Sequence, residues 1–142
     1  MARMSPELAK TFIGVQKDGK LSRCPDMPNC VCSQHADDKD HFQEPILFKG
    51  SVDEAKDFLQ SALKSMTGAR VVANQGPYLR VEFTSGFFKF VDDVEFLAVP
   101  EQGLIHFRSA SRLGKWDIGA NRKRMEELKQ EFMKQTKAKA KS

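Results

Sequence analysis

The chain has 142 residues, of which 40% are hydrophobic and 30% charged, and its formal net charge is +4. This length and composition fit one soluble globular domain that can bury its own core. No stretch approaches the ~20 consecutive apolar residues of a membrane span, so the sequence predicts no transmembrane segment. The N-terminus also lacks a secretory signal, which predicts a soluble, cytoplasmic protein unless an export or anchor segment precedes this stretch.

We expect three parts along the chain: an N-terminal extension over residues 1–20, a single α+β domain over 21–135, and a basic disordered tail over 136–142. The tail is expected to be disordered because its sequence, rich in lysine, lacks apolar periodicity. No basic stripe alternates with aromatic residues elsewhere in the chain. The sequence therefore argues against nucleic acid as a partner.

The first regular elements follow a long loop over residues 21–44. Residues 46–49 are typical of a short strand. Ser51 then opens a helix, because Ser51 and Glu54 form the capping-box pattern and apolar residues recur at helical spacing after them. Gly68 is placed to end this helix.

Alternating apolar residues after the helix predict a run of antiparallel strands. Strands over residues 69–73 and 78–83 are joined by a turn that contains Gly76 and Pro77. A tight turn at Ser85-Gly86 would place Phe83 opposite Phe88 in the next hairpin.

A further turn at Glu101-Gln102 predicts the last hairpin. It would place Phe96 opposite Phe107 and Glu95 opposite Arg108. The three hairpins agree on one apolar face, as a half-buried antiparallel sheet requires.

A closing helix is expected over residues 120–135, with Met125, Leu128 and Phe132 on its apolar stripe. The predicted order is strand, helix, four antiparallel strands, helix. This order favours an α+β fold: a single curved antiparallel sheet of TBP-like topology with both helices packed on one face. The comparison concerns topology and carries no implication of DNA binding.

Three cysteines, Cys24, Cys30 and Cys32, lie close together with His41 downstream, and their spacing leaves three interpretations open. Thiolates and imidazoles are zinc ligands, but the C-x2-C pairs of common structural zinc sites are missing, so we predict no metal site. Alternatively, a disulfide joins Cys24 to Cys30, which requires an oxidising compartment. The third interpretation is free thiols in a proline-containing loop.

Polar chemistry is concentrated in residues 108–124, where the last strand leads into the closing helix. Asp92 interrupts the apolar face of the neighbouring strand, and a buried carboxylate there needs a partner. Its predicted cross-strand neighbour is Ser111, and Asn121 approaches from the helix. A bulge at Asp92-Asp93 would turn Asp93 inward instead.

This polar corner predicts a site for an anionic small molecule or the acidic group of a partner, because arginine binds such groups through paired hydrogen bonds. The candidate ligand-binding residues are Asp92, Asp93, Arg108, Ser109, Ser111, Arg112, Asp117, Asn121 and Arg122. The competing interpretation is that these arginines only neutralise the nearby acids in a local ion-pair network.

Catalytic candidates are Cys24 and Cys30 as nucleophiles and His41 as a base, for a cysteine-dependent hydrolase or redox protein. No recognised catalytic or phosphate-binding motif accompanies them, which favours a binding module over an enzyme, and no cofactor is predicted. A third hypothesis is a structural subunit without a ligand, which docks through an exposed patch at Val91 and Leu97 and the basic tail.

Three blocks of the sequence together resemble a known family. They are CPDMPNCV from Cys24, DDVEF from Asp92, and RSASRLGKWDIGANRKR from Arg108. In this order and spacing they are similar to the uncharacterised family called domain of unknown function 1499, and the resemblance spans about residues 21–128. The family pattern usually has serine in place of Cys32, so the resemblance implies a shared role only for Cys24 and Cys30 among the cysteines.

Overall fold

The computed structural model describes residues 12–85, 90–112 and 119–141. It contains six strands, two α-helices and one short 3-10 helix within these ranges. The elements are β1 (Cys30–Cys32), β2 (Ile46–Leu47), α2 (Val52–Lys64), β3 (Ala69–Gln75), β4 (Tyr78–Thr84), β5 (Val91–Val99), η1 (Pro100–Gln102), β6 (Leu104–Ser111) and α3 (Ala120–Lys141).

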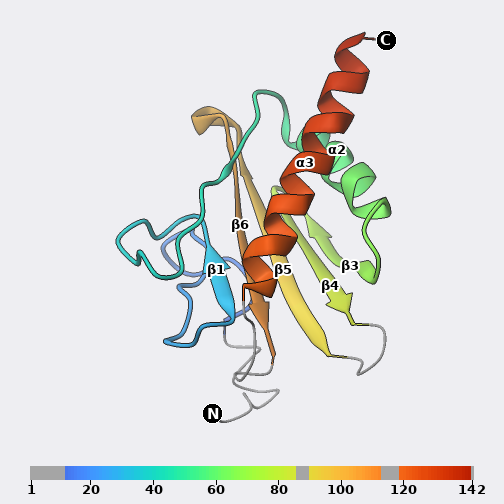
Figure 1. The fold of residues 1–142 in the computed structure, drawn as a ribbon. Coiled ribbons are helices and arrows are strands. Elements are labelled where there is room, and N and C mark those ends of the chain that lie inside the picture. Colours follow the sequence, from blue (N-terminus) through green and yellow to red (C-terminus); the bar gives the residue numbers. More distant parts are fainter. Residues whose placement is uncertain (1–11, 86–89, 113–118, 142) are drawn as a thin grey trace.

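All six strands form one antiparallel sheet in the order β1-β6-β5-β4-β3, and β2 pairs with another part of β6 (Figure 1). Strands β3 to β6 follow one another as neighbours, so the chain builds most of the sheet by simple hairpins. The sheet is open and not strongly curled, in contrast to the curved sheet that the sequence suggested. The TBP-like topology stays a prediction.

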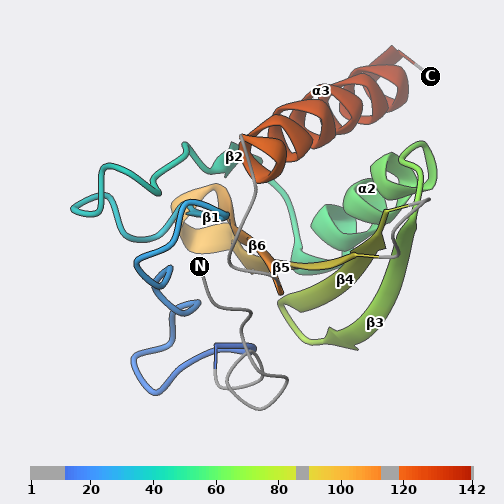
Figure 2. The same cartoon turned by 60° about the horizontal axis from the view of Figure 1, so that its bottom comes forward.

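Both helices cover one face of the sheet, and the first residues that the structure describes, from Phe12 on, lie against the opposite face (Figure 2). The core lies between the helices and the sheet. It includes Leu59 of α2, Phe96 and Phe107 of the sheet, and Leu128 and Phe132 of α3, each at most 2% exposed. The predicted α+β class, with two helices on the phenylalanine-rich face, is confirmed.

Helix α2 begins as the sequence indicated. The Ser51 hydroxyl accepts the Glu54 N–H at 3.1 Å, and the Glu54 carboxylate accepts the Ser51 N–H at 3.0 Å, which completes the capping box. Gly68 in the following connection has a φ of 85°, and a Cβ there would lie 2.5 Å from the Thr84 carbonyl oxygen. Glycine is therefore required where this connection meets β4.

The last hairpin has the predicted register. Phe96 pairs with Phe107, Glu95 with Arg108, and Asp92 with Ser111, and no bulge interrupts β5 at Asp92. The short helix η1 forms the turn.

The predicted register of the β4–β5 hairpin is wrong. Phe83 pairs with Asp92 rather than with Phe88, so β5 begins later and a longer connection replaces the tight turn. The shift is four residues, an even number, so each side chain of β5 stays on its predicted face. Hydrophobic alternation fixes the face of a strand but does not distinguish registers that differ by an even number.

Two further differences lie outside the hairpins. β1 forms within the stretch expected to be a loop, because its three residues pair with β6. Helix α3 continues to Lys141, where we expected a disordered tail. Alanine, lysine and glutamine have high helix propensity, so the helix extends without an apolar stripe.

The N-terminal extension is in contact with the sheet over the residues that the structure describes. The Gly14 N–H donates to Glu95 at 2.6 Å, and Val15 forms an isolated bridge with Leu21. No helix among the described residues is both long and apolar enough to cross a bilayer.

Candidate functional site

The predicted polar corner divides into two clusters on opposite faces of the sheet, because successive side chains of a strand point to opposite sides. The core-face cluster lies under α3 and comprises Asp92, Ser109, Ser111, Asn121 and Arg124. The outer-face cluster lies on the other side and comprises Tyr78, Arg80, Glu82, Asp93, Glu95, Arg108 and Arg112.

Asn121 is the centre of the core-face cluster. It lies in the first turn of α3 and is fully buried. Its Oδ1 accepts the Ser109 hydroxyl at 2.6 Å and Arg124 Nη1 at 2.7 Å, while its Nδ2 donates to Ser111 Oγ at 3.0 Å and to the Asn29 carbonyl at 2.9 Å. One amide side chain therefore joins α3, β6 and the residue before β1.

Arg124 forms an ion pair with Asp92, the carboxylate that interrupts the apolar face of its strand. Its Nη2 donates to Asp92 Oδ2 at 2.6 Å, and its guanidinium lies over the Phe83 ring at 4.9 Å from the centroid. The Arg124 and Asp92 side chains are 19% and 14% exposed. This ion pair is therefore accessible from one side.

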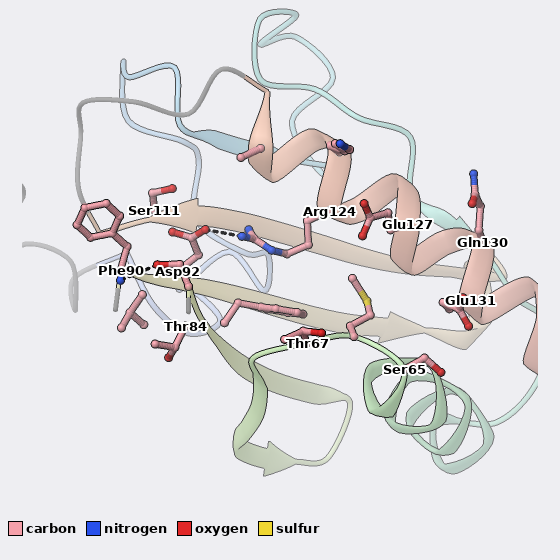
Figure 3. Close-up of a pocket in the computed structure, with 16 residues that line it drawn as sticks. Ser65, Thr67, Thr84, Phe90, Asp92, Ser111, Arg124, Glu127, Gln130 and Glu131 are labelled. Atoms are coloured by element: carbon pink, nitrogen blue, oxygen red, sulfur yellow. Dashed lines mark hydrogen bonds and ion pairs between the residues drawn. The ribbon is translucent and has the colours of Figure 1, made fainter. Parts of the chain in front are cut away.

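That accessible side is a groove of about 840 Å³ between α3 and the end of α2, over the core face of the sheet (Figure 3). Met66, Phe83, Phe90 and Val91 supply apolar lining. Polar lining comes from Asp92, Ser111, Lys123, Arg124, Glu127 and Glu131. Figure 3 places the Asp92–Arg124 pair and Ser111 at one end and Glu131 at the other.

Arg112 is held in the outer-face cluster. Its Nε and Nη2 donate to the two carboxylate oxygens of Asp93 at 2.8 and 2.9 Å, and Nη2 also donates to Glu82 at 2.8 Å. Arg80 contacts both of these acids, and Arg70 contacts Glu82. This arrangement matches the competing interpretation of the sequence, in which the arginines neutralise nearby acids in a local ion-pair network.

Glu95 and Arg108 form the buried part of the outer-face cluster. Glu95 is fully buried and accepts the Tyr78 hydroxyl at 2.7 Å and the Gly14 N–H at 2.6 Å. Arg108 donates to Glu95 across 3.5 Å and lies over the Phe12 ring. Burial raises the pKa of Glu95, against the opposing charge of Arg108.

Two other candidate residues, Arg122 and His41, form hydrogen bonds to residues of the long loop over residues 21–44 and lie apart from both clusters. Arg122 donates to the carbonyls of Phe42 and Asp40. His41 contacts Asp38 through Nδ1 at 2.8 Å and the Met27 carbonyl through Nε2 at 2.7 Å. Neither side chain lines the groove.

Cys24 and Cys30 form a disulfide, with their Cα atoms 5.7 Å apart. Neither sulfur is a free thiol in this structure, so a nucleophilic role would first require reduction. Cys32 is free and buried, and burial raises the pKa of its thiol. No group of three or more potential metal ligands occurs among the described residues.

The structure brings together Asp92, Ser109, Ser111 and Asn121, as the sequence suggested, but places Asp93, Arg108 and Arg112 on the opposite face. Asp117 lies outside the described residues. Sequence reasoning missed Arg124. Its signal was its position three residues after Asn121, which puts both side chains on one face of the helix.

The hypothesis of docking requires an exposed patch at Val91 and Leu97, but Leu97 is not exposed. Leu97 is only 6% exposed, because the outer face of β5 is covered rather than open to solvent. Val91 instead lines the groove.

Fold and site together define a small α+β protein with an open antiparallel sheet, two helices on one face, and a groove beside the second helix. The chain belongs to the family described as protein of unknown function DUF1499, whose model matches residues 20–132. The family resemblance of the sequence is therefore confirmed. No curated protein and no solved structure matches the chain.

Proposed function

We propose that the protein is a binding module whose groove takes a small organic molecule with an apolar body and one anionic group. The groove is the observation that carries this proposal. Its volume of about 840 Å³ lies in the range of ~300–1,000 Å³ in which small-molecule sites usually fall. Its mixture of apolar lining and a few charged groups is also usual for such sites.

The anionic group is expected at the end of the groove where α3 begins. Lys123 and Arg124 line that end, and so does Ala120, the first residue of the helix. The N-terminal end of a helix carries a partial positive charge, which favours negative charge there. Arg124 already contacts Asp92, so an incoming anion would share this arginine with the carboxylate.

The other end of the groove has the opposite character. Glu127, Gln130 and Glu131 line it, together with Ser65 and Thr67 from the connection after α2 (Figure 3). Carboxylates and amides there accept hydrogen bonds from hydroxyl or amine groups. The ligand that fits this groove is therefore amphipathic and polar at both ends.

The disulfide supports a location in an oxidising compartment rather than the cytoplasm that the sequence suggested. Disulfides persist in such compartments and are rare where thiols are kept reduced. Cell fractionation followed by thiol labelling without reductant would test the location.

An aromatic sulfonate, 1-anilinonaphthalene-8-sulfonate, is a suitable probe for the groove because it joins an apolar body to one anion. Calorimetric titration into the oxidised protein is expected to show one site. Arg124→Gln and Lys123→Gln should each weaken binding, Arg124→Gln by about tenfold or more, since hydrogen bonds to charged groups contribute about 1.5–3 kcal/mol.

Arg70→Gln is the matched control, because Arg70 is an exposed arginine whose carboxylate contact is Glu82, on the outer face. Lys123 is exposed, so its replacement should leave the thermal midpoint unchanged and separates a binding defect from a folding defect. The proposal fails if the probe does not bind stoichiometrically, or if both groove variants bind it as tightly as Arg70→Gln does.

A further inference from the structure

A short loop links the disulfide to the groove. The Cys24–Cys30 bond closes this loop, and its last residue before β1 is Asn29, which is 2% exposed. The Asn29 carbonyl accepts two hydrogen bonds, from the Ser111 N–H at 3.0 Å and from Asn121 Nδ2 at 2.9 Å. The conformation of the loop therefore determines whether Asn121 keeps this one of its two acceptors.

Asn121 in turn holds groove residues. Its Oδ1 accepts Arg124 Nη1 at 2.7 Å, and its Nδ2 donates to Ser111 Oγ at 3.0 Å. Arg124 and Ser111 both line the groove, and Arg124 holds Asp92 there. Only Asn29 and Asn121 separate the disulfide from the proposed anion-binding end.

We propose that the Cys24–Cys30 disulfide regulates ligand binding in the groove, with the oxidised form binding more tightly than the reduced form. This inference rests on the proposed function. The disulfide acts together with the pairing of β1 and β6 to hold the Asn29 carbonyl against Asn121, and Asn121 orients Arg124 for the ligand. Reduction frees the loop at one end, so Asn121 loses a fixed acceptor and Arg124 loses a fixed orientation.

The reductant would be a dithiol, either a small molecule or a protein with a paired thiol site. Its thiolate attacks Cys24 Sγ, the sulfur of the half-buried cysteine, and Cys30 leaves as a thiolate that takes up a proton. The second thiol of the reductant then displaces Cys24. The dithiol loses two electrons and two protons, and the two cysteines gain them.

The surroundings of the disulfide favour a reversible change. Two separate thiols need more room than a bonded pair, and a small cavity lined by Pro25 and Cys30 adjoins the bond. Burial raises the pKa of Cys32, so this third thiol stays protonated near neutral pH and is a poor competitor for exchange. His41 still holds the loop through the Met27 carbonyl, which limits how far the loop moves.

The affinity test uses the full chain and the same sulfonate probe. Treatment with dithiothreitol is expected to weaken binding by about fivefold or more, a usual size for coupling between two sites. The Cys24→Ser/Cys30→Ser variant should bind like the reduced protein and not respond to dithiothreitol. Cys32→Ser should keep the response. Equal affinity in the two redox states, or a response that persists without the disulfide, overturns the inference.

A second measurement needs no ligand. Nitrogen-15 NMR follows the side-chain amide of Asn121 and the Nε–H of Arg124, and both signals should move on reduction while the Arg70 signal stays. Movement of these signals without probe binding would support the coupling and refute the proposed function. Unmoved signals would refute the coupling whatever the probe does.

Discussion

Glu95 has unusual surroundings for an acidic side chain. It is fully buried on the outer face of the sheet, where an ionised carboxylate is costly, and its contact with Arg108 is long at 3.5 Å. Burial therefore raises the pKa of Glu95 above its usual value of 4.5. In the folded protein the carboxyl group holds its proton to a higher pH than it does in the unfolded chain.

This shift predicts how stability depends on pH. Above pH 4.5 the folded state binds more protons at Glu95 than the unfolded state, so this residue makes the free energy of unfolding fall as pH rises toward the raised pKa. The Glu95→Gln variant has no carboxyl group at this position, so this decrease in the free energy of unfolding with pH is absent. The free energy of unfolding of the variant, minus that of the native protein, should therefore increase with pH through this window, as measured by urea unfolding.

Glu82→Gln is an informative control because its effect has the opposite sign. Burial alone would raise the pKa of Glu82, but hydrogen bonds from Arg70 and Arg112 lower it below the usual 4.5. The stability from Glu82 is present above pH 4.5 and lost as pH falls through the lowered pKa. A Glu95→Gln difference that stays constant with pH would contradict the prediction.

At the scale of elements, the contact between α3 and the sheet depends on both apolar packing and one polar anchor. Met125, Leu128 and Phe132 pack into the core, and Asn121 begins the same helix face with hydrogen bonds to β6 and to the residue before β1. The apolar residues attach the helix. Asn121 determines where along β6 its first turn lies.

Asn121→Ala should therefore destabilise the fold by about 2 kcal/mol or more, because it leaves buried groups such as the Ser109 hydroxyl without their partner. Gln130→Ala on the same helix is the control, since an exposed substitution changes stability by about 0.5 kcal/mol or less. Urea unfolding measures both. Equal stability of the two variants would show that the anchor contributes nothing.

The helices and hairpins also show which elements could be predicted. The capping box and the apolar stripe predicted α2. Alternation of apolar and polar residues, together with the turn sequence, predicted the β5–β6 hairpin. The β4–β5 hairpin was mispredicted because registers that differ by an even number of residues keep every side chain on the same face, so hydrophobic alternation could not single out the Phe83–Asp92 pairing. β1 could not be predicted, since its three residues become a strand only where β6 offers hydrogen bonds.

For the whole molecule, the disulfide adds stability as well as shape. It ties the loop before β1 to the edge of the sheet, next to the N-terminal segment on the outer face (Figure 2). The closed loop is short, with a sequence separation of 6, so it restricts the unfolded chain only moderately.

Cys24→Ser/Cys30→Ser should lower the free energy of unfolding by about 2 kcal/mol, the value that loop entropy gives for a ring of this size. The native protein in dithiothreitol should show the same loss, and the variant in dithiothreitol no further loss. Denaturant unfolding of four samples, the native protein and the variant each with and without dithiothreitol, measures this. A native protein that is equally stable with and without dithiothreitol would show that the bond does not stabilise the folded state relative to the unfolded chain.

By itself, the sequence determined the α+β class, the faces of strands β3 to β6, the start of each helix and the family. These properties follow from local patterns: a period of two or 3.6 residues, a capping box, and short motifs. It also identified Asp92, Ser111 and Asn121 as neighbours, because register and helix periodicity extend over short distances.

Only the tertiary structure decided what the polar residues do. It separated Arg108 and Arg112 from Asn121, since the sheet lies between them, and it brought Arg124 to Asp92 at one end of the groove. It also brought Cys24 to Cys30 and the loop between them to α3. Such contacts join residues that are far apart in the sequence. They depend on how helices and strands pack together, which no local sequence pattern specifies.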